Sequence, residues 1–129
     1  MLDPAIFKYT KANVALVSDR VHNVHAPQGE ERPYIVFEVT NTNFVNSMGG
    51  DSGLAESPVR FHVFGDTKDS VNNVIAQLKT TYRNYFSSSN MSGEHLVQTT
   101  MLNNEANMRY ERDTKLFHGI LDVIFWHTE

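Results

Sequence analysis

Residues 26–40, Ala-Pro-Gln-Gly-Glu-Glu-Arg-Pro-Tyr-Ile-Val-Phe-Glu-Val-Thr, are the stretch that decides the fold class. The first half carries prolines and a glycine within a polar run, which predicts a turn. The second half, from Tyr34 to Val39, is almost continuously β-branched or aromatic, which predicts a strand. Because Pro33 lacks an N–H group, it fits the first residue of that strand, before ladder hydrogen bonds are required.

The rest of the chain predicts two helices and four further strands. An apolar stripe favours a helix over residues 1–17, capped by Asp3, and a clearer stripe favours a second helix over residues 67–86. Alternating or β-branched runs predict further strands at residues 20–24, 58–64, 95–102 and 114–128. We therefore predict one α+β domain over residues 1–129, in the order α-β-β-β-α-β-β. Its sheet is expected to be mainly antiparallel, with both helices packed on one face.

Residues 42–57 are polar and contain three glycines, so they predict a long hairpin loop. Long loops in compact domains are often functional. Phe44, Val45, Met48 and Leu54 add apolar character, and a loop that displays apolar side chains is a candidate contact with a partner.

The composition excludes several classes of protein. A formal net charge of −4 argues against a protein that neutralises the phosphates of nucleic acids. The absence of cysteine excludes a disulfide framework and a thiolate metal site. The amino terminus has no signal-peptide pattern, and no apolar run approaches the ~20 residues of a membrane span. We expect a protein that folds in the cytoplasm of the cell that makes it, with no membrane contact.

Gly50-Asp51-Ser52-Gly53 copies the loop around the nucleophile of chymotrypsin-like proteases, but Leu54 follows where those enzymes carry a glycine. A small hydrolase that uses Ser52 and a histidine remains one alternative. The six histidines include no recognisable set of metal ligands, and His62 and His118 are expected on the outer faces of their strands. We therefore expect no catalytic residue, metal or cofactor.

An ordered set of segments resembles the tail-completion (tail-terminator, or head-to-tail joining) proteins of long-tailed bacteriophages. The set spans nearly the whole chain. The segments are Asp19-Arg20-Val21-His22, Ala26-Pro27-Gln28-Gly29, Pro33-Tyr34-Ile35-Val36, Ser52-Gly53-Leu54, Val59 to Leu78, Glu111-Arg112-Asp113-Thr114-Lys115-Leu116-Phe117 and Asp122-Val123-Ile124-Phe125-Trp126-His127. The asparagine-rich stretch from Thr40 to Met48 departs from the family pattern.

The resemblance implies a structural virion protein that caps the tail tube and joins the tail to the head. The subunits would form a hexameric ring, contacting the tail-tube protein and the head connector or stopper proteins. DNA would pass through the lumen without sequence-specific binding, which suits an acidic chain. Contacts between subunits are expected in the loop from Phe44 to Leu54, the loop from Ser87 to Gly93 and the segment from Asn104 to Lys115. The candidate interface residues are Phe44, Val45, Met48, Asp51, Ser52, Leu54, Arg109 and Arg112. A monomeric adaptor that binds a single partner is the other alternative.

Overall fold

In the residues that it describes, the computed structural model of the chain contains two helices, a 3-10 turn and seven strands. The helical elements are α1 (Leu2–Asn13), η1 (Ala15–Val17) and α2 (Lys68–Tyr82). The strands are β1 (Val21–Asn23), β2 (Tyr34–Val39), β3 (Asn43–Ser47), β4 (Gly50–Gly65), β5 (Asn90–Met91), β6 (His95–Glu111) and β7 (Leu116–Thr128). The structure describes residues 2–17, 20–26, 31–47, 50–83, 85–87, 90–112 and 115–128, with only the backbone for residues 46, 47, 50–52, 107 and 108.

The sheet has seven strands in the order β1-β2-β4-β7-β6-β5, and β3 pairs with β4 outside this path. Every pairing is antiparallel except that of β1 with β2, which places Val21 beside Ile35 in parallel register. The predicted α+β class and the mainly antiparallel sheet are confirmed. The predicted order lacked β3 and β5.

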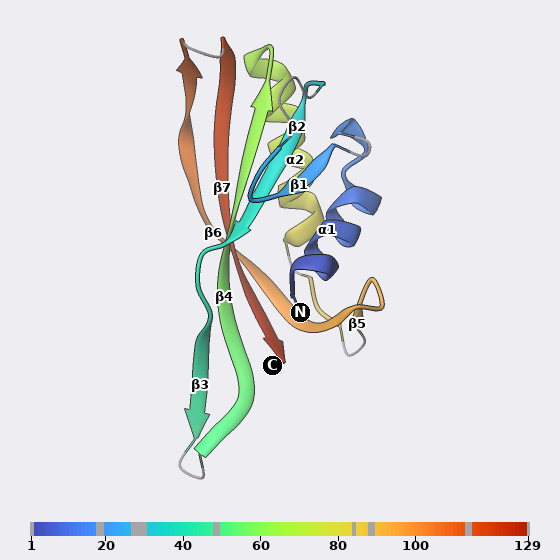
Figure 1. Cartoon of the computed structure of the whole chain (residues 1–129), viewed down its shortest axis with the longest axis vertical. Helices are drawn as coiled ribbons and strands as arrows, with labels where there is room; N and C mark the ends of the chain where they lie inside the picture. Colours follow the sequence, from blue (N-terminus) through green and yellow to red (C-terminus); the bar gives the residue numbers. More distant parts are fainter. Residues whose placement is uncertain are drawn as a thin grey trace.

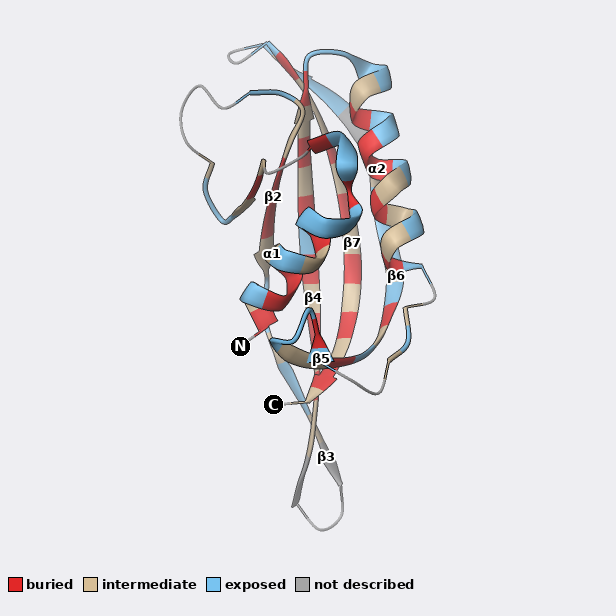
Figure 2. Cartoon of the chain, turned by 90° about the vertical axis from the view of Figure 1, so that its right-hand side faces the viewer, coloured by how far each residue is buried: buried red, intermediate tan, exposed pale blue. Residues whose placement is uncertain are grey.

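Both helices lie on the same side of the sheet, as the two views of the chain show (Figures 1 and 2). The predicted stripe of α2 is buried, from Val71 to Tyr82, and Thr67 caps the helix by accepting a hydrogen bond from the N–H of Ser70 at 3.1 Å. The stripe packs against alternate residues of β4 and β7. These inward residues are Val59, Phe61, Val63, Leu121, Val123 and Phe125.

The helices end earlier than predicted, for local and tertiary reasons. The side chain of Asn13 donates to the carbonyl of Tyr9 at 2.8 Å, which competes with continuation of α1. The backbone is extended at Arg83, after α2. The carbonyl of Tyr85 then accepts one hydrogen bond from the hydroxyl of Thr99 and another from the N–H of Thr100, both on β6. Residue 85 is therefore bound to the sheet instead of extending the helix. No helix within the described ranges is long and apolar enough to cross a membrane.

Candidate functional site

A hairpin arm, defined as residues 43–57, extends the sheet beyond the body of the protein (Figure 1). The prediction of a loop over residues 42–57 was wrong, because β3 and the first half of β4 pair in antiparallel register. Val45 lies opposite Leu54, and a register shift follows between Val45 and Asn46. β7 joins β4 from Leu54 onward, so the base of the arm belongs to the main sheet. The backbone groups that a loop would leave to solvent are thus satisfied by strand pairing.

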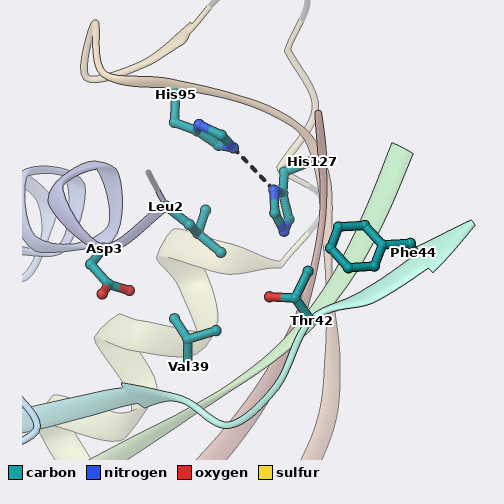
Figure 3. A pocket seen from close by; sticks show the side chains of 7 residues that line it. All are labelled: Leu2, Asp3, Val39, Thr42, Phe44, His95 and His127. Carbon is teal, nitrogen blue, oxygen red and sulfur yellow. Dashed lines mark hydrogen bonds between the residues drawn. The ribbon is translucent and has the colours of Figure 1, made fainter. Parts of the chain in front are cut away.

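The arm presents one large apolar side chain to solvent near its base. Phe44 is 57% exposed, whereas Ala55, its cross-strand partner, is fully buried. Val45 and Leu54 are half-buried. Phe44 also forms one wall of an open hollow at the base of the arm, which Leu2, Asp3, Val39, Thr42, His95 and His127 complete (Figure 3). An exposed phenylalanine beside such a hollow is a feature typical of surfaces that contact a protein partner.

A chain of hydrogen bonds fastens the arm to the body behind this hollow. The hydroxyl of Ser57 lies 3.0 Å from that of Thr42 and 2.7 Å from Nε2 of His127, and Nδ1 of His127 lies 3.0 Å from Nε2 of His95. Two opposite proton arrangements satisfy all three contacts with neutral imidazoles. In one, Thr42 donates to Ser57, Ser57 donates to Nε2 of His127, and Nδ1–H of His127 donates to His95; in the other, every donor and acceptor is exchanged. These hydrogen bonds join the segment before β3 to β4, β7 and β6.

The same hydrogen bonds bring the hydroxyl of Ser57 to the distance at which His127 could activate it as a nucleophile. A nucleophile must also reach its substrate, and Ser57 is fully buried while His127 is 1% exposed. The arrangement therefore serves as a structural link in this conformation. The serine that the sequence suggested for a hydrolase, Ser52, has its side chain outside the described residues.

The structure separates the predicted interface residues into two groups. Phe44, Val45 and Leu54 lie together on the arm, and the backbones of Asp51 and Ser52 lie in β4 nearer its tip, although their side chains are outside the description. Met48 lies outside the described residues. Arg109, near the end of β6, and Arg112, just after β6, are both exposed. This end of β6 lies at the opposite end of the molecule from the arm (Figure 1).

Most of the segment from Asn104 to Lys115, a candidate contact between subunits, is strand, because β6 continues to Glu111. The predicted loop from Ser87 to Gly93 likewise contains β5, which pairs with the start of β6. Sequence reasoning missed the contacts of His95 and His127, which lie 32 residues apart. No local pattern marks such a pair. Among the described residues, no group of three or more His, Cys, Asp or Glu side chains is arranged to hold a metal ion.

Comparison with solved structures shows that other proteins share this fold. The chain is similar to a chain of the solved structure "Virion of native gene transfer agent (GTA) particle", with a TM-score of 0.72 and 14% identity over 99% of this chain and 95% of that chain. At this identity the likeness shows a shared fold. "Structure of bacteriophage SPP1 gp17 protein" matches with a TM-score of 0.47 and 21% identity, over 95% of this chain and 88% of that one.

The sequence then identifies the family. Residues 4–128 match the family described as tail completion protein gp17, and the chain belongs to this family. No curated protein matches the chain. The predicted resemblance to tail-completion proteins is confirmed, and with it a structural role in the bacteriophage tail and in virion assembly.

Proposed function

We propose that six copies of the chain form a ring at the head-proximal end of the tail, which caps the tail tube and joins it to the head connector. The observation that carries this proposal is the family match over residues 4–128. A structural subunit of this kind needs no catalytic site. In a cyclic ring each subunit contacts its neighbour through two different surfaces. The arm and the opposite end of β6 offer two such surfaces at separate ends of one subunit.

The arm supports the proposal as an assembly element. It is a continuation of the sheet held at its base by buried hydrogen bonds, so its direction relative to the body is set before a partner binds. Pre-organisation of this kind lowers the entropic cost of association. Phe44 supplies the apolar anchor that protein interfaces commonly bury.

The first test measures mass in solution by light scattering, for the chain alone and after mixing with tail tubes that lack a head-proximal cap. The subunit has a mass of 14.7 kDa, so a six-subunit ring has a mass of about 88 kDa. We expect that species, free or on tubes. A strict monomer that does not bind tubes would refute the ring and favour an adaptor with another partner.

The second test removes the tip of the arm and keeps its base. Residues 46–53 are replaced by Asn-Gly, which suits a two-residue hairpin turn and preserves the pairing of Val45 with Leu54. A milder variant, Phe44→Ser, has as its control Leu16→Ser, because Leu16 is an apolar residue of similar exposure, 44%, on η1. We expect both arm variants to remain folded and to lose tube capping by at least tenfold, about 1.4 kcal/mol. Normal capping by both would exclude the arm as a contact.

The proposal includes passage of DNA without retention. The net charge of −4 supports it, since a wall that binds phosphates needs a basic surface. We expect no measurable binding to duplex DNA at about 0.15 M salt. Salt-sensitive binding below micromolar concentration would contradict this part of the proposal.

A further inference from the structure

A row of four titratable side chains crosses the sheet on the face opposite the helices. Nε2 of His62 on β4 lies 3.3 Å from the carboxylate of Glu38 on β2. Nδ1 of His62 lies 2.9 Å from Nε2 of His118 on β7. Nδ1 of His118 lies 3.0 Å from the carboxylate of Glu111 on β6. The row therefore links four strands through three consecutive contacts.

Counting protons along the row gives a definite result. A carboxylate only accepts hydrogen bonds, so Nε2 of His62 and Nδ1 of His118 must each carry a proton to bond their glutamates. If both rings are neutral, Nδ1 of His62 and Nε2 of His118 then face each other with lone pairs at 2.9 Å. One additional proton between these two nitrogens makes all three contacts hydrogen bonds. All three contacts are therefore hydrogen bonds at once only when the four ring nitrogens carry three protons.

The surroundings favour a shared proton over hydration of each ring. The side chains of His62 and His118 are only 22% and 15% exposed. The ring of Phe64 stacks on His118 with centroids 4.4 Å apart, and Tyr34 stacks on Phe64 from the other side. A second hollow lies over these rings, and His25 lines it together with His62 and His118. Partial burial strengthens hydrogen bonds within the row and limits the water that could replace them.

The charges that face the pair are balanced by one proton. Among the described residues, the neighbouring groups are the carboxylates of Glu38, Glu111 and Asp122 and the guanidinium groups of Arg60 and Arg109. Three negative and two positive charges leave the cluster one charge below neutrality. A single shared proton cancels this charge, whereas a second would leave the cluster positive and place two N–H groups against each other.

We propose that His62 and His118 bind one proton jointly, as a singly charged imidazole–imidazolium pair, and that a second proton opens this row. The hydrogen bonds that connect β2, β4, β7 and β6 through this row then depend on the number of protons that the pair binds. Burial and the neighbouring charge of His62 lower the pKa of His118, which agrees with resistance to the second proton. A zinc ion bound tetrahedrally by the same nitrogens would hold them about 3.3 Å apart, so the 2.9 Å separation fits a proton better.

The test is a titration of ¹⁵N-labelled full-length chain between about pH 4 and 9, followed by long-range ¹H–¹⁵N spectra that report the protonation of each imidazole nitrogen. We expect two separate steps for the pair, and between them three of its four ring nitrogens protonated. Glu38→Gln should shift release of the shared proton to lower pH. The control Glu56→Gln, on the same strand as His62, should leave both steps unchanged.

The wild-type titration decides the proposal even if a variant fails to fold. Two independent single steps, or two neutral rings throughout the interval between the steps, would overturn it. A Zn²⁺ titration on the same sample gives a further check. Stoichiometric zinc binding at micromolar concentration that removes the two-step behaviour would make the row a metal site and would also overturn the proposal.

Discussion

Gly119 lies where β7 meets α2, and replacing it by alanine tests how closely these elements pack. A Cβ atom at this position would lie 2.5 Å from Cδ1 of Ile75 and 2.9 Å from Cγ1 of Val71. Overpacking of a core costs about 1–3 kcal/mol. Alanine also has less conformational entropy than glycine in the unfolded chain, and this offsets the cost by up to about 1 kcal/mol. We expect Gly119→Ala to lower the free energy of unfolding by about 1–2 kcal/mol, or the Tm by about 4–7 °C.

Thermal and urea denaturation followed by circular dichroism measure this loss. Ile75→Val removes the Cδ1 atom at 2.5 Å and by itself costs about 0.5–1.5 kcal/mol. We expect the double variant to lose less than the sum of the single losses, because the closest contact is gone. The rescue is partial, since the stiff side chain of Val71 remains at 2.9 Å.

Gly93→Ala is the matched control, because Gly93 has φ +72° and an added Cβ would meet nothing within 4 Å. The stability loss of Gly93→Ala comes from the left-handed backbone conformation. In a double variant, this loss should therefore simply add to the loss caused by Ile75→Val. A Gly119→Ala variant as stable as the wild type, or strictly additive with Ile75→Val, would refute the packing argument.

Three further predictions concern polar groups. Tyr82→Phe leaves the buried hydroxyl of Thr10 without its 2.6 Å partner and should cost about 1–3 kcal/mol in chemical denaturation, and Thr10→Val should restore most of that loss. Because the pKa of His118 is lowered from 6.5, the unfolded chain binds more protons, so stability should fall as pH drops below about 6.5. His118→Gln should flatten this slope, and an unchanged slope would rule out His118 as its source. A hydrogen bond to Asp122 raises the pKa of Arg60, but the pair is partly exposed, so a double-mutant cycle should give only about 0.2–1 kcal/mol, decreasing with salt. A coupling that salt does not change would contradict this estimate.

The sequence predicted the elements whose residues alternate between core and solvent. The stripe of α2 and the inward faces of residues 58–64 and 114–128 are buried as predicted. These patterns are local, because burial of one face imposes its own period on the sequence. The arm and the second half of β6 were missed because much of their length is partly or fully exposed, so burial leaves no such period.

The candidate site was likewise only partly predictable from the sequence. Phe44, Val45 and Leu54 were identified from their apolar character within a polar stretch, and the structure places them together on the arm. Their separation from Arg109 and Arg112 along the length of the molecule could not be predicted, because it depends on the direction of β6 within the sheet.

By itself, the sequence determined the α+β class, the buried faces and the tail-completion family, since local periodicity and ordered motifs are properties of the chain. Only the tertiary structure decided that residues 42–57 form a paired arm and that His62 meets His118, 56 residues away. Strand register sets these contacts, and register depends on the packing of the whole sheet against its helices.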